Sequence, residues 1–106
     1  MVTMKQIRQL SRQIVKEFRP QRIVLFGSYA RAAGTENSDV DLLVITPFKG
    51  RPVAKSVEIR LKIRPSFPVD ILVRTPEKVL KRLAMGDTFM REILESGTVL
   101  YETRDA

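Results

Sequence analysis

The chain has 106 residues, which is the length of one small domain, and 43% of them are hydrophobic, which is enough for one core. It contains neither cysteine nor histidine. Disulfides, nucleophile pairs that use Cys or His, and the usual zinc sites are therefore excluded. If the protein is an enzyme, its chemistry must come from carboxylates, hydroxyls, Lys and Arg, or a hard cation bound through oxygen.

No segment of the sequence predicts a membrane span. The longest apolar runs, residues 23–26 and 42–45, are four residues each, whereas a transmembrane helix needs roughly 20. The first six residues also lack the apolar stretch of a secretory signal. We therefore expect a cytoplasmic protein.

The net charge of +7 is concentrated in two segments. Residues 1–22 hold six basic residues and one acidic residue, and residues 49–64 hold the same numbers. Two interpretations remain open: a solvated basic face, which is slightly favoured, and a surface for nucleic acid or another polyanion. A base-stacking platform is not indicated, because Phe18 is the only aromatic residue among the basic ones.

In the first half of the chain, residues 4–18 predict an amphipathic helix that Pro20 ends. Its apolar face is Ile7, Leu10, Ile14 and Phe18, and its outer face is Lys5, Arg8, Arg12 and Lys16. A buried strand is expected at residues 22–26 and stops at Gly27-Ser28. A short helical stretch at residues 29–33 follows, and then a loop leads to a second strand at residues 39–45.

In the second half, residues 53–64 fit both a helix and an alternating strand. We predict a helix, because a helical crossover joins two parallel strands simply. A third strand at residues 69–74 is followed by a helix that begins at Thr75-Pro76-Glu77, by another that Asp87 caps, and by a last strand at residues 98–101. The expected fold class is a small α/β (α+β) domain with helices flanking a mixed sheet.

Polar residues at the strand ends form the candidate site. Gly27-Ser28 lies at a strand end where free backbone N–H groups attract an anion, although Gly-Ser is also an ordinary turn. Asp39 and Asp41 are two residues apart on a strand, so their carboxylates point to the same face. They are either ligands for Mg²⁺ or a pair that faces solvent. Asp70 is costly in an apolar strand unless it is paired, metal-bound or at the strand end. If the second and third strands are parallel neighbours, Asp70 completes a three-carboxylate cluster.

Together these motifs resemble a known family. They are Gly27-Ser28-Tyr29-Ala30-Arg31 after a strand, Ser38-Asp39-Val40-Asp41-Leu42-Leu43-Val44, and then Asp70 on the next strand. The pattern is similar to the nucleotidyltransferase fold of the polymerase-beta superfamily and, more narrowly, to the minimal nucleotidyltransferase (MNT) proteins. The likeness implies one domain over residues 1–106, with a core at about residues 22–101 after the N-terminal helix. One departure is Ala32, where the family usually has glycine.

The resemblance also implies roles for the site residues. Gly27 and Ser28 would hold the β- and γ-phosphates of ATP, and Asp39 and Asp41 would bind Mg²⁺. Asp70 would complete a second metal position and help to deprotonate the attacking hydroxyl. Arg31 would steady the triphosphate, or form a structural ion pair with an aspartate.

The family further implies a partner. MNT proteins are typically antitoxins that place AMP on a tyrosine of a HEPN-family toxin, which predicts a protein adenylyltransferase here. Two other functions stay open: a binding module that neutralises a partner by docking alone, and a basic nucleic-acid-binding protein.

Overall fold

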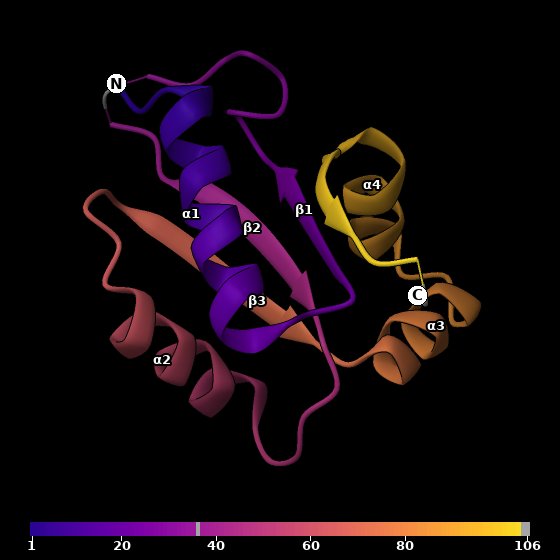
Figure 1. Cartoon of the computed structure of the whole chain (residues 1–106). Helices are drawn as coiled ribbons and strands as arrows, with labels where there is room; N and C mark the ends of the chain where they lie inside the picture. The colour runs from indigo at the N-terminus through magenta and orange to yellow at the C-terminus, as the bar shows by residue number, and fades with distance from the viewer. Residues whose placement is uncertain (36, 105–106) are drawn as a thin grey trace.

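The computed structural model describes residues 1–35 and 37–104 as four helices and four strands (Figure 1). In chain order they are α1 (Met4–Phe18), β1 (Arg22–Phe26), β2 (Val40–Ile45), α2 (Pro52–Ile63), β3 (Val69–Arg74), α3 (Pro76–Ala84), α4 (Thr88–Ser96) and β4 (Thr98–Glu102). No helix in the described residues is long and apolar enough to span a membrane.

The strands form one mixed sheet in the order β3-β2-β1-β4. β1 pairs antiparallel with both β2 and β4, whereas β2 and β3 run parallel. Parallel neighbours need a crossover connection, and α2 supplies it. The predicted helix at residues 53–64 is therefore confirmed, and the parallel pairing on which it and the carboxylate cluster were conditional is present.

Each face of the sheet packs against its own pair of helices. On one face, α1 and α2 bury one set of strand side chains in the larger core: Ile7, Leu10, Ile14, Ile23, Leu25, Val40, Leu42, Val44, Ile59, Val69, Ile71 and Val73. On the other face, α3 and α4 cover a smaller apolar cluster: Val24, Leu43, Ile45, Val79, Met90 and Ile93. Because side chains alternate along a strand, the residues on this second face include Phe26, Asp41 and Asp70.

The predicted helix at residues 29–33 is wrong. Successive tight turns occupy this segment, in which the Ala30 amide donates to the Gly27 carbonyl at 3.2 Å and the Arg31 amide to the Ser28 carbonyl at 3.1 Å. Ala32 then has a left-handed backbone, with φ at 55°. A helix cannot continue through such a residue, so the chain turns away from β1 instead.

Candidate active site

The candidate site lies on a row of three residues that crosses the sheet. Phe26 on β1 is directly opposite Asp41 on β2, and Asp41 is directly opposite Asp70 on β3. The expectation that Asp70 lies beside Asp41 is therefore confirmed. The next row inward on the same face, Val24, Leu43 and Leu72, belongs to the apolar cluster under α3 and α4. The acidic row thus lies where this cluster ends and the sheet face opens.

The negative charges of Asp39 and Asp70 act on the carboxyl of Asp41. Asp41 is half-buried, and this burial raises the pKa of its carboxyl above the ordinary value; the negative charges of Asp70 and then Asp39 raise it further. The Arg31 guanidinium acts in the opposite direction and favours the ionised form. A carboxylate in this setting is stabilised by any cation that comes between it and its neighbours.

The three carboxylates do not converge on one point. Among residues 1–35 and 37–104, no three acidic side chains lie close enough together to hold a metal ion. Asp39 precedes the first residue of β2, and both Asp39 and Asp70 are exposed, whereas Asp41 is half-buried. The expected cluster is therefore present as neighbouring positions on adjacent strands and not as a closed ligand set.

Gly27 fits against the Asp41 carboxylate. Its backbone is left-handed, with φ at 75°, and a Cβ added there would overlap Oδ2 of Asp41. Only glycine brings the chain this close to the acidic row without steric conflict. The hydroxyl of Ser28, the next residue, makes no hydrogen bond to any described residue. The turn thus offers a polar side chain and close backbone beside Asp41.

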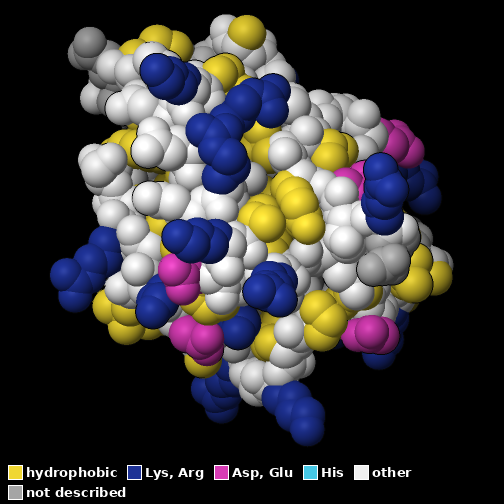
Figure 2. All heavy atoms as spheres, in the orientation of Figure 1, with side chains coloured by type: hydrophobic (Ala, Val, Ile, Leu, Met, Phe, Trp, Pro, Cys, Tyr) yellow, Lys and Arg dark blue, Asp and Glu magenta, His cyan; other side chains and the backbone are white. Residues whose placement is uncertain are grey.

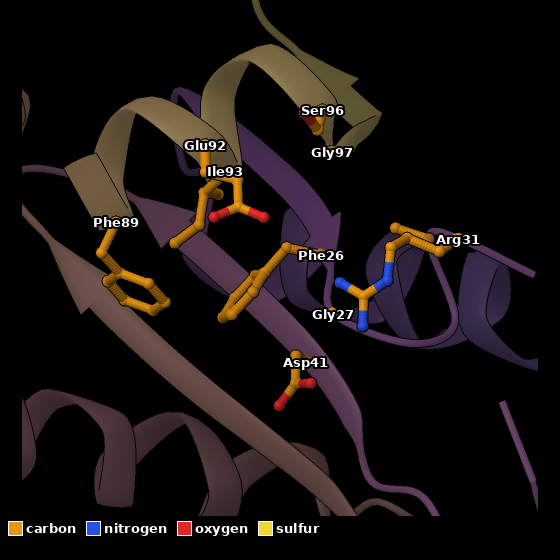
Figure 3. Close-up of a pocket in the computed structure, with 10 residues that line it drawn as sticks. Phe26, Gly27, Arg31, Asp41, Phe89, Glu92, Ile93, Ser96 and Gly97 are labelled. Atoms are coloured by element: carbon orange, nitrogen blue, oxygen red, sulfur yellow. The ribbon is translucent and has the colours of Figure 1, made fainter. Parts of the chain in front are cut away.

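A cleft of about 280 Å³ opens above this row (Figure 3). The turn after β1 and strand β2 form one side of it, where Gly27, Arg31 and Asp41 are the predicted site residues that line it. Ser28, Asp39 and Asp70 do not line it. Helix α4 forms the other side with Phe89, Glu92, Ile93 and Ser96.

Sequence reasoning did not place the α4 residues in the site. Their spacing of three and four marks one face of a helix, yet an apolar helix face ordinarily predicts packing against a core. Met90 and Ile93 do pack in this way, and the neighbouring face lines the cleft. The only signal in the sequence was Glu92, an acidic residue among the apolar ones.

The start of α4 is fixed by Asp87. Its carboxylate accepts the Met90 N–H at 3.0 Å and the Arg82 Nε–H at 2.8 Å. These two hydrogen bonds, the Met90 bond first, lower the pKa of Asp87. At the other end, a Cβ on Gly97 would lie 2.6 Å from Cγ1 of Val24 and 2.8 Å from the Leu25 carbonyl, so α4 ends in tight contact with β1. Both ends of the cleft wall are thereby held.

Known proteins share this sequence pattern and this fold. Residues 7–101 match the family described as Nucleotidyltransferase domain. A curated protein of Methanocaldococcus jannaschii, provisionally named a protein adenylyltransferase, is 34% identical over 83 residues, which cover 78% of this chain and 80% of that protein.

Three solved structures have a similar fold. A provisionally assigned nucleotidyltransferase of Sulfolobus solfataricus has a TM-score of 0.65 and 16% identity, covering 95% of this chain and 80% of that one. A toxin–antitoxin structure with AMP-PNP has a TM-score of 0.61 and 23% identity, covering 98% and 77%. The tri-AMPylated HEPN toxin of Shewanella oneidensis in complex with an MNT antitoxin has a TM-score of 0.51 and 20% identity, covering 96% and 76%. The family match over most of the chain, together with the curated relative, shows that this chain belongs to the nucleotidyltransferase domain family.

Proposed function

We propose that the protein transfers AMP from ATP to a tyrosine hydroxyl of a HEPN-family toxin, with Mg²⁺, as the antitoxin of the pair. The observation that carries the proposal is Asp41, which lies opposite Asp70 in the sheet and against the Gly27 turn. A turn that can approach phosphates is thereby next to carboxylates that suit a hard cation. The relative provisionally named a protein adenylyltransferase agrees with this chemistry.

The donor set fits magnesium. Burial, and then the negative charges of Asp70 and Asp39, raise the pKa of Asp41, and a divalent cation relieves the repulsion among the charges. Asp39, Asp41 and Asp70 would hold the ion or ions once their side chains turn inward. Bound there, Mg²⁺ supplies charge neutralisation for the entering and leaving oxygens of a phosphoryl transfer.

The other residues orient the triphosphate. Gly27 gives the β- and γ-phosphates close access to backbone N–H groups, and the Ser28 hydroxyl adds one hydrogen bond. Arg31 lines the cleft on the same side as Asp41 (Figure 3) and pairs with phosphate oxygens. No described residue forms a salt bridge with Arg31. A role of Arg31 in holding the triphosphate is therefore favoured over a structural ion pair with an aspartate.

In the reaction the acceptor oxygen bonds to the α-phosphorus of ATP as the bond from that phosphorus to the bridging oxygen breaks. Pyrophosphate leaves with the electron pair of the broken bond. The hydroxyl proton passes to the Asp70 carboxylate, which is exposed and can release it to water. The products are the AMP-tyrosine phosphodiester and pyrophosphate.

The fold relatives support the proposed partner. One similar structure pairs an MNT antitoxin with a HEPN toxin that carries AMP groups, and another holds AMP-PNP. A complex with a HEPN toxin supplies the acceptor, and a cytoplasmic location is part of the proposal because ATP is the donor.

The proposal is tested by following each phosphate of ATP. The purified pair is incubated with Mg²⁺ and ATP labelled at the α- or the γ-phosphate. We expect the toxin to take up the α-label alone, because the transferred group is AMP. Asp41→Asn should abolish the uptake, and Glu95→Gln, which removes an exposed acid of α4 outside the cleft, should not. Uptake of the γ-label, or full uptake with Asp41→Asn, contradicts the proposal.

A further inference from the structure

The α4 wall of the cleft differs in chemistry from the wall that faces it. The facing wall holds Arg31 and Asp41, which suit phosphates and a cation, beside the apolar Phe26 and Ala30. Helix α4 contributes two apolar side chains, a hydroxyl and a carboxylate from one helix face: Phe89, Ile93, Ser96 and Glu92. A ligand that spans the cleft therefore has an anionic end and an end that is largely apolar with a polar edge. A nucleoside polyphosphate has this construction.

Phe89 provides an open aromatic surface. Its ring meets Phe26 edge to face, with ring centroids 5.9 Å apart and an interplanar angle of 83°. This contact holds the pair in place, and Phe89 is still 55% exposed. An aromatic ring that is anchored and yet uncovered suits stacking by a second flat, conjugated ring.

Glu92 provides a hydrogen-bond acceptor next to that surface. Its carboxylate points into the cleft from the turn of α4 after Phe89 (Figure 3). It has no salt-bridge partner in the described part of the chain. An ionised carboxylate accepts hydrogen bonds and donates none, so it selects a ligand that presents an N–H or O–H group.

We propose that this α4 wall is a nucleobase subsite, in which Phe89 stacks on the base and Glu92 accepts a hydrogen bond from its exocyclic amino group. The inference rests on the proposed function, because the Gly27 turn and Asp41 then hold the triphosphate and leave α4 for the base. It names Glu92 as the residue that makes the site prefer adenine to a purine without an amino group.

The experiment compares two non-transferable ligands, α,β-methylene ATP and its counterpart that lacks the 6-amino group. Dissociation constants are measured by calorimetry with Mg²⁺. The wild type should bind the amino compound about tenfold more tightly, as expected for a hydrogen bond to a charged acceptor. Glu92→Gln should reduce this ratio to about threefold or less. Glu95→Gln removes the same charge one turn away and should leave the ratio unchanged.

A second variant tests the stacking surface separately. Phe89→Leu keeps an apolar side chain but removes the ring, so both ligands should bind at least about fivefold more weakly with their ratio unchanged. Equal binding of the two ligands by the wild type, or an unchanged ratio in Glu92→Gln, overturns the inference. If AMP transfer still takes place in that case, the proposed function stands without it. If no triphosphate binds and no AMP is transferred, both fail.

Discussion

Two residues between β1 and β2, Gly27 and Ala32, have left-handed backbones, but only Ala32 carries a side chain. Gly27, at φ 75°, has no Cβ and must have none, because Asp41 occupies that space. Ala32, at φ 55°, carries a Cβ in a conformation that usually costs an L-residue about 1–2 kcal/mol. Glycine adopts this backbone at position 32 without that cost.

We predict opposite effects of two substitutions in this turn. Gly27→Ala should lower the free energy of unfolding by more than about 1 kcal/mol and remove AMP transfer, because Asp41 must move. Ala32→Gly should raise that free energy by about 0.5 kcal/mol, the relief of strain less the added entropy of the unfolded chain. For both variants, urea denaturation measures the free energy of unfolding and the α-label assay measures AMP transfer. A Gly27→Ala variant with normal transfer would refute the contact with Asp41 as a requirement of the site.

The raised pKa of Asp41 predicts how stability depends on pH without metal. Its folded pKa is above the unfolded value, so the native state holds the proton more readily and loses stability as pH rises through the folded pKa. Asp41→Asn should therefore melt at a higher temperature than the wild type at pH 7. The difference should shrink as pH falls toward the ordinary aspartate value of about 3.9.

Magnesium provides the control for this prediction. It should raise the melting temperature of the wild type and leave that of Asp41→Asn nearly unchanged, because the binding charge has been removed. An Asp41→Asn variant that is less stable than the wild type at pH 7 without metal would show that Asp41 is stabilised by its neighbours and not repelled.

At the scale of elements, β3 is an edge strand whose outward carbonyls are each occupied. Its Val69 carbonyl accepts from Arg60 and its Ile71 carbonyl from Ser56, both on α2, and its Val73 carbonyl accepts from Arg74, each at 2.7 Å. An open strand edge pairs readily with another chain. Helix α2 therefore both crosses between the parallel strands and shields the edge that carries Asp70.

We expect Ser56→Ala to lower the free energy of unfolding by about 0.5–1.5 kcal/mol, the usual net contribution of one hydrogen bond. Ser66→Ala is the matched control, because Ser66 is exposed and makes no hydrogen bond among the described residues. Chemical denaturation of the three proteins gives the comparison. Equal losses in both variants would mean that the bond to the Ile71 carbonyl does not contribute.

The elements that sequence predicted correctly are those with strong local signals. The alternating or apolar runs predict the strands, Thr75 and Asp87 cap helices as expected, and the crossover argument selects helix α2. The prediction for residues 29–33 was wrong, since their composition fits a helix but the segment forms tight turns that end in the left-handed backbone of Ala32. Tertiary contacts, which no local pattern encodes, decide such a segment.

The same limit applies to the site. Asp41 and Asp70 were predicted as neighbours because a parallel register places them so. The α4 side of the cleft was missed, because it depends on how a helix late in the chain packs over the strand β1. Phe89 and Glu92 reach the cleft only through that packing.

At the scale of the molecule, the two basic segments form one face. Helices α1 and α2 lie side by side, joined by the Lys62–Glu17 pair at 3.8 Å and by Lys55 over the Phe18 ring. Figure 2 shows Lys and Arg side chains spread over this side of the molecule. Helices α1 and α2 cover the sheet face opposite Asp41, so their Lys and Arg side chains do not line the cleft. A polyanion on this face would leave the active site free.

On the opposite face, the acidic end that α3 and α4 leave uncovered is open to an acceptor. The chain folds to a radius of gyration of 13.2 Å, as expected for one compact domain of about 100 residues. The acidic row lies at the border of the smaller apolar cluster, and both Asp39 and Asp70 are exposed there. Under the proposed function, a hydroxyl of the partner reaches these exposed carboxylates.

The most direct test is the mass of the HEPN toxin after co-expression with this protein. With the wild type we predict toxin that carries AMP on tyrosine and is inactive. With Asp41→Asn we predict unmodified, active toxin, and with Glu95→Gln the wild-type result. Toxin that is neutralised by Asp41→Asn as well as by the wild type, and that gains no AMP with either, would contradict the account and show that neutralisation is by binding alone.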